Sequence, residues 1–111
     1  MQTYDRYILH MDTDPIALMY TIDGDLGNKA HGRDSIRRFL ATFKNVRVLS
    51  QLSKTTSINI RDDSLLQKGT YAQVAIVGEK DTVRVQGEYT VDWRWFPEEG
   101  WKIKRMDTKS R

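Results

Sequence analysis

The chain has 111 residues, of which 39% are hydrophobic and 30% are charged, and none of them is cysteine. This composition is typical of one soluble globular domain. It excludes disulfides, thiolate metal sites and a membrane-spanning helix, which needs roughly 20 apolar residues in a row. The net charge of +3 arises from 18 basic and 15 acidic residues interspersed along most of the chain, so we expect no nucleic-acid partner. Because no apolar run is long enough to span a membrane, we expect a cytoplasmic domain over residues 1–111 without a membrane partner.

Two short helices are predicted at the N-terminus. The first is indicated by four large side chains at helical spacing in "YDRYILHM": Tyr4, Tyr7, Ile8 and Met11. The second follows in "DTDPIALMY", where Asp14 is suited to cap a helix and Pro15 to occupy its first position. The Gly- and Asp-rich stretch "TIDGDLGNKAH" then predicts a small hairpin that turns near Gly27 and Asn28.

The next segment, "RDSIRRFLATF", predicts the main helix, which begins at Gly32 or Arg33. Its apolar side chains recur at positions i, i+3, i+4 and i+7, and therefore share one face: Ile36, Phe39, Leu40 and Phe43. We expect this face to pack on the core while the intervening arginines stay in water.

Beyond Asn45 the hydrophobic period changes from that of a helix to that of a strand, and it stays so to the end of the chain. The four expected strands lie in "VRVLSQLSKTTSINI", "LLQKGTYAQVAIVG", "TVRVQGEYTVDWRW" and "GWKIKRMDT". The turn sequences "RDDS", "GEKD" and "FPEEG" separate them and predict antiparallel pairing in sequence order. Helices followed by such a meander predict an α+β fold with the helices packed on one face of the sheet.

Alternation within these strands predicts which face is buried. The core-facing side chains of the first strand are expected to be Val46, Val48, Leu52, Ile58 and Ile60. In the third strand we expect the odd positions from Val83 to Trp95 in the core and the even positions from Arg84 to Arg94 outside it. This polar face mixes charges of both signs and could meet its own copy across a two-fold axis, so we expect a homodimer through the sheet.

Five aromatic side chains come from neighbouring strands, and several of them are expected on the concave side of a curved sheet: Tyr71, Tyr89, Trp93, Trp95 and Trp101. They could form a solid core, or they could line a pocket in which a Tyr or Trp contributes a polar group. The sequence leaves both interpretations open.

His31, directly before the main helix, is the candidate for acid-base chemistry because a histidine can exchange a proton at neutral pH. It could act as a base together with Asp25 or Asp107, or it could simply lie on the rim beside the helix start. We expect the second arm of the hairpin to place it at the mouth of a pocket, with its side chain pointing outward. Two widely separated histidines and no cysteine give no metal-binding cluster.

Five stretches, taken together and in this order, carry a family resemblance: "DPIALMYTIDGDL", "HGRDSIRRFL", "KGTYAQV", "GEYTVDWRW" and "GWKIKRMDT". The chain resembles the nuclear-transport-factor-2-like superfamily, in its SnoaL-like and ketosteroid-isomerase-like branches, over nearly its whole length. The resemblance implies a cone, in which a strongly curved, mostly antiparallel sheet wraps over a long helix and short helices open the chain.

The resemblance leaves three functions open, because this superfamily shares a pocket but not a chemistry. The first is a domain that binds a small apolar or amphipathic ligand without a cofactor. The second is a lyase or isomerase acting on a small carbonyl compound, and the third is a dimerisation module with a filled cone. In the ketosteroid-isomerase-like branch an Asp base lies at the end of the first strand, where this chain has Asn28, which cannot take a proton at neutral pH. We therefore favour ligand binding.

The resemblance also implies site residues. Asp25 could replace the Asp base that the family has at the position of Asn28, if the hairpin register is shifted. Dehydratase-type members of the superfamily pair a His with an Asp. His31 and Asp25 are therefore the catalytic candidates. The tyrosine donor of the first helix matches Tyr4 or Tyr7. The residues expected to line the pocket are Tyr7, Tyr20, His31, Phe39, Tyr71, Tyr89, Trp93, Met106 and Asp107.

Overall fold

The computed structural model describes residues 2–10, 12–43, 46–78 and 80–110, so that Met11, predicted on the first helix, lies outside the described residues. The elements are α1 (Gln2–His10), α2 (Thr13–Leu18), β1 (Tyr20–Leu26), β2 (Ala30–His31), α3 (Arg33–Ala41), β3 (Val46–Arg61), β4 (Ser64–Val77), β5 (Asp81–Phe96) and β6 (Gly100–Ser110). Among the described helices, none has the length and apolar character needed to cross a membrane.

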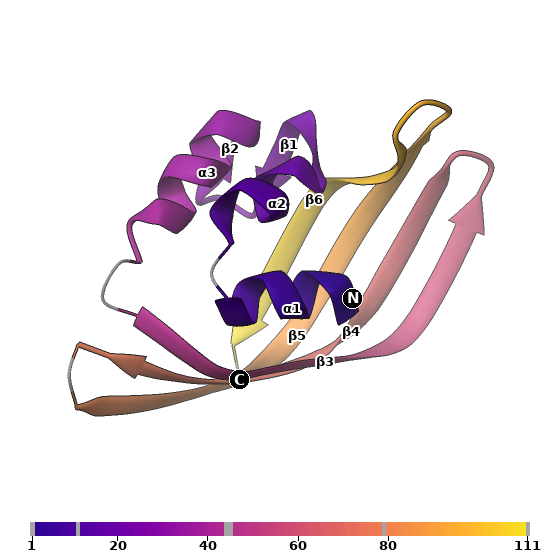
Figure 1. Cartoon of the computed structure of the whole chain (residues 1–111). Coiled ribbons are helices and arrows are strands. Elements are labelled where there is room, and N and C mark those ends of the chain that lie inside the picture. The colour runs from indigo at the N-terminus through magenta and orange to yellow at the C-terminus, as the bar shows by residue number, and fades with distance from the viewer. Residues whose placement is uncertain (1, 11, 44–45, 79, 111) are drawn as a thin grey trace.

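The six strands form one strongly curved, open sheet in the order β2-β1-β6-β5-β4-β3. Its pairs are antiparallel except for β1 and β6, which run parallel. Figure 1 shows the three helices on the concave side of this sheet, with α1 lying across it and α2 and α3 together at one end. The predicted α+β class, the small hairpin and the antiparallel meander are confirmed. The predicted main helix, α3, has nine residues and is thus as long as α1.

The start of α2 differs from its prediction. The helix begins at Thr13 with Asp12 in the cap position, so the prediction that Asp14 caps it is wrong. The amide of Ile16 already donates to the carbonyl of Asp12, which closes the first helical turn there. Asp14 and Pro15 fit inside this turn because the first amides of a helix have no partner within it and favour a negative charge nearby.

The predicted apolar face of α3 is shorter than expected. Ile36 and Leu40 are buried and Phe39 is partly buried, but the helix ends at Ala41 and Phe43 lies beyond it, exposed to solvent. The ring of Phe43 still packs edge-to-face on that of Phe39, with the ring centres 5.2 Å apart. Phe43 therefore extends the apolar surface of the helix without being part of the core.

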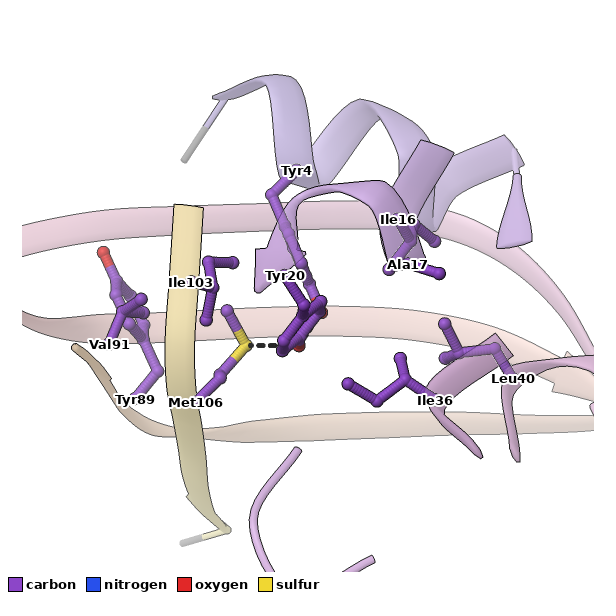
Figure 2. Close-up of a cluster of buried hydrophobic side chains, with 10 residues drawn as sticks. All are labelled: Tyr4, Ile16, Ala17, Tyr20, Ile36, Leu40, Tyr89, Val91, Ile103 and Met106. Carbon is purple, nitrogen blue, oxygen red and sulfur yellow. Dashed lines mark hydrogen bonds between the residues drawn. The ribbon is translucent and has the colours of Figure 1, made fainter. Parts of the chain in front are cut away.

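The main core lies between the helices and the central part of the sheet. Its buried members converge from α1, α2, α3 and three strands, as Figure 2 shows: Tyr4, Ile16, Ala17, Tyr20, Ile36, Leu40, Tyr89, Val91, Ile103 and Met106. The hydroxyl of Tyr20 donates to the sulfur of Met106 across 3.7 Å, drawn as a dashed line in Figure 2. This core fixes α1, β1 and β6 relative to one another.

The predicted alternation of β5 is confirmed in the middle of the strand and wrong at its ends. Tyr89 and Val91 are buried, but Val83 is 39% and Trp95 is 45% exposed. Trp101 is exposed too and packs edge-to-face on Trp95. In Figure 1 both ends of β5 extend past the helices, in agreement with the exposure of these side chains. Trp95 and Trp101 thus belong to neither the core nor the pocket.

The predicted core face of β3 is wrong at three positions. Leu52, Ile58 and Ile60 are 67%, 53% and 65% exposed, whereas Val48 is buried. The register with β4 shifts between Val48 and Ser50, where one extra residue enters β3. Such a bulge exchanges the two faces of the strand beyond it, and Ser53, rather than Leu52, comes onto the concave face opposite Tyr71.

Two glycines in the sheet make room for two tyrosine rings. Gly69 pairs with Tyr89 and Gly87 pairs with Tyr71 across β4 and β5. A Cβ atom at Gly69 would lie 2.6 Å from the ring of Tyr89, and one at Gly87 would lie 2.8 Å from the ring of Tyr71. Each ring therefore lies over its partner glycine, which holds both rings along the concave face.

Candidate functional site

A cavity of about 300 Å³ lies between the helices and the concave face of the sheet. Its apolar wall comes from α1, α3, β5, β6 and the segment after α3: Ile8, Phe39, Leu40, Phe43, Val85 and Met106. Tyr4, Tyr71 and Tyr89 add aromatic rings, and Lys29 of the β1–β2 turn is a basic lining residue. Five strands and two helices thus shape one mostly apolar space.

A polar group lines another part of this cavity, where α1 crosses β3. One carboxylate oxygen of Asp5 accepts hydrogen bonds from the Ser53 hydroxyl at 2.6 Å and the Ser53 amide at 3.1 Å. The other accepts a longer bond, 3.4 Å, from the side-chain amide of Gln51. Gln73 of β4 donates in turn to the Gln51 oxygen at 2.9 Å. These bonds fix the Asp5 carboxylate against the sheet.

Tyr4 lines the cavity and is backed by Tyr20, which is part of the core. Their hydroxyl groups share a hydrogen bond of 2.8 Å. Burial raises the pKa of Tyr4 to about 12 and raises that of Tyr20 as well, because a phenolate there would lose its hydration. Both phenols therefore stay protonated at neutral pH and act as hydrogen-bonding groups.

The raised pKa of Tyr4 predicts a loss of stability in alkali. Above pH 10 the unfolded chain releases this proton while the folded chain retains it, so the free energy of unfolding falls as pH rises. The loss is about 1.4 kcal/mol per pH unit for one such tyrosine between pH 10 and 12. Urea unfolding of the wild type and Tyr4→Phe at pH 9 and pH 11 measures it. The variant should lose less stability over this interval, and an equal loss in both proteins would contradict the assignment.

A second network holds the Tyr89 hydroxyl. The buried side chain of Gln67 donates to Thr55 at 2.7 Å and to the Tyr89 hydroxyl at 3.5 Å, and it accepts from the indole of Trp93 at 3.0 Å. Trp93 thus supports the cavity from behind Tyr89 without lining it.

Of the nine predicted lining residues, four line this cavity: Phe39, Tyr71, Tyr89 and Met106. The other five do not: Tyr7, Tyr20, His31, Trp93 and Asp107. Tyr7 packs at the edge of the core and Tyr20 lies inside it. Asp107 lines a smaller hollow of about 210 Å³ by the β1–β2 turn.

The structure brings the acid-base candidates together outside the cavity. Nδ1 of His31 contacts a carboxylate oxygen of Asp25, its cross-strand partner in the small hairpin. Arg105 of the neighbouring strand lies 3.7 Å from the other Asp25 oxygen and donates to Asp107 at 2.8 Å. The bonds to Asp107 raise the pKa of the Arg105 guanidinium. The His31 side chain is 74% exposed, so this group is a surface ion-pair network.

Sequence reasoning missed the polar part of the cavity, above all Asp5, Gln51 and Gln73. The signal in α1 was present, since Asp5 follows the buried Tyr4 and precedes Ile8 by three residues, which puts it on the same side of the helix as Ile8. Gln51 reaches the concave face only through the bulge in β3. In the part of the chain that the structure describes, no group of His, Cys, Asp and Glu has a metal-binding arrangement.

No protein-family model matches the chain, and no curated protein matches it in sequence. Solved structures do match its architecture. A ketosteroid isomerase-like protein from Erwinia carotovora atroseptica has a TM-score of 0.83 at 16% identity, over 96% of this chain and 87% of its own. A putative calcium/calmodulin-dependent protein kinase II association domain from Xanthomonas campestris has a TM-score of 0.83 at 19% identity, over 99% and 81%.

A nuclear transport factor 2-like superfamily protein from Salmonella enterica matches as well, with a TM-score of 0.79 at 13% identity, over 96% of this chain and 82% of its own. The chain has the nuclear-transport-factor-2-like fold. The predicted resemblance is thereby confirmed at the level of fold. In this nuclear-transport-factor-2-like structure the cavity is lined by the sheet and by Tyr4, Asp5 and Ile8 of α1.

Proposed function

We propose that this protein binds a small amphipathic ligand in the cavity on the concave face of its sheet. The observation that carries the proposal is the cavity itself, about 300 Å³ in volume, mostly apolar, and with a few fixed polar groups. Ligand sites have this combination, because apolar walls supply affinity and a small number of polar groups supply orientation. Solved proteins of the same fold include one described as ketosteroid isomerase-like, which supports binding of a small apolar molecule.

Filling the cavity should abolish binding. We expect Val85→Phe to weaken the affinity for 1-naphthalenemethanol, a neutral amphipathic probe, at least tenfold, because Val85 lines the cavity and a larger ring there takes up its space. Titration calorimetry measures the affinity. Val83→Phe is the matched control, since Val83 has the same orientation two residues earlier on β5 but lies outside the lining, and its affinity should stay within twofold. No binding by the wild type, or equal losses in both variants, would contradict the proposal.

A lyase or isomerase that transfers protons is the alternative function. The contact between His31 and Asp25 favours it, since a paired His and Asp can act as a base. Both residues lie outside the lining of the cavity, however, and Asp25 is shared with Arg105. We therefore propose binding without catalysis by this pair, and His31→Ala in the same titration should change the binding free energy by less than about 1 kcal/mol.

We also propose a homodimer formed through the outer face of the sheet. The outward positions of β5 carry Arg84, Glu88, Asp92 and Arg94, and all of them are exposed or half-buried. A face with both signs of charge can match its own copy when the copies are related by a two-fold axis. The similar structure described as a kinase association domain supports an assembly role for this fold.

The mass in solution tests this assembly. Light scattering at micromolar concentration should give twice the chain mass of 13.0 kDa. Arg84→Glu together with Arg94→Glu should lower it to the monomer, because two positive charges on the proposed interface become negative. A monomer mass for the wild type would overturn the dimer but would leave the binding proposal untouched.

The charged and hydrophobic shares of the sequence, 30% and 39%, also support a cytoplasmic location as part of this proposal.

A further inference from the structure

We propose that the ligand of this cavity carries a protonated amine, which binds the carboxylate of Asp5. This inference rests on the proposed binding function and adds the chemical class of the ligand. It follows from the charge, the hydrogen bonds and the rings that surround Asp5 on the cavity wall.

Among the described residues, Asp5 is the one acidic residue that lines the cavity. Its hydrogen bonds in the described part of the chain come from Ser53 and Gln51, which are neutral, and no ion pair with Asp5 is found there. Neutral donors orient a carboxylate but bring no positive charge to pair with it. A cationic ligand would supply that charge beside a half-buried carboxylate on a mostly apolar wall.

The two carboxylate oxygens are not equally engaged. The oxygen bound by Ser53 accepts two bonds of 2.6 and 3.1 Å, whereas the other accepts one bond of 3.4 Å from Gln51, near the upper limit for a hydrogen bond. A carboxylate can accept about four hydrogen bonds. The oxygen facing Gln51 therefore retains acceptor capacity for an ammonium group.

Lys29 does not take this role. It is the basic residue of the cavity lining, but it is exposed in the β1–β2 turn, and no ion pair between Lys29 and Asp5 is found among the described residues. An exposed lysine without a direct contact to Asp5 contributes little to the charge balance of that carboxylate.

The rings of the cavity suit the remainder of such a ligand. Phe39, Phe43, Tyr71 and Tyr89 offer an aromatic surface for an apolar body. Aromatic faces also attract cations, so they add to the preference for an amine over a neutral group of the same size. The inferred ligand class is a compact aromatic or alicyclic amine.

Three probes with the same naphthalene ring and a one-carbon substituent test the inference on the wild type: 1-naphthylmethylamine, 1-naphthalenemethanol and 1-naphthoic acid, titrated at pH 7. We expect the amine to bind at least tenfold tighter than the alcohol and the acid to bind most weakly. Asp5→Asn should lower the amine affinity at least tenfold and change the alcohol affinity less than threefold, because Asn keeps the size and an acceptor but not the charge. Asp81→Asn, an exposed acid at the start of β5, should change neither.

The outcomes separate this inference from the proposed function. Equal affinities for amine and alcohol in the wild type would overturn the amine while leaving the binding proposal in place. Absence of binding for all three probes would overturn the binding proposal, and the inference with it. An amine preference that persists in Asp5→Asn would overturn the assignment to Asp5. If this variant does not fold by circular dichroism, the wild-type series alone still decides the ligand class.

Discussion

Gly69→Ala is expected to lower the free energy of unfolding by about 3 kcal/mol or more. A Cβ atom at this position would lie 2.2 Å from the carbonyl oxygen of Lys54 on β3 and 2.6 Å from the ring of Tyr89 on β5. The first contact is with backbone, which cannot move without separating β3 from β4. The second displaces a ring that lines the cavity, so binding of 1-naphthalenemethanol should weaken in the same variant.

Urea unfolding at pH 7 measures this loss, with Thr70→Ala as control. Thr70 is the next residue on β4, and its replacement removes atoms from a position that already has a Cβ atom, so a loss within about 1 kcal/mol is expected. Equal stability of Gly69→Ala and the wild type would show that the strands are further apart at Gly69 than described.

Ile103→Ala is expected to cost about 2–5 kcal/mol, because it opens a cavity in the core where β6 meets β1. Ile103 is fully buried, and its amide donates to the carbonyl of Met19 at 2.7 Å, which ties β6 to the end of α2. The side chains around it come from different elements of the fold, as Figure 2 shows, so they cannot all move to fill the space.

The matched control is Ile22→Ala on the neighbouring strand β1. Ile22 is 76% exposed, so the same chemical change should alter the free energy of unfolding by less than about 0.5 kcal/mol. Urea unfolding of both variants gives the comparison. Similar losses at the two positions would mean that the core is not centred between β1 and β6.

Some side chains of this protein belong both to the buried core and to the wall of the cavity. Tyr4, Tyr89 and Met106 belong to the buried core and also line the cavity. Their replacement would change folding and binding together, which is why the binding experiments use Val85 and Asp5. Val85 is partly exposed and Asp5 has an isosteric replacement, so both report on the ligand with the least effect on the core.

The sequence by itself determined the elements and their order. The period of two from Val46 onward and the turn sequences between the strands are local signals, because side-chain alternation and turn conformations depend on neighbouring residues. They predicted β3 to β6 and their antiparallel pairing correctly. Gly32 and the apolar spacing after it likewise predicted the start of α3. In the structure Gly32 has a φ of +87°, a conformation that favours glycine.

Only the tertiary structure decided which side chains meet in the cavity. Asp5 reaches Ser53 and Gln51 because α1 lies across β3, an arrangement that depends on packing between residues about fifty positions apart. The bulge in β3 then turns Leu52 outward, and no pattern in the strand itself marks the extra residue. His31 and Asp25 are cross-strand partners in the small hairpin, but only the tertiary structure shows that they lie outside the cavity lining, beside Arg105 and with the His31 side chain 74% exposed.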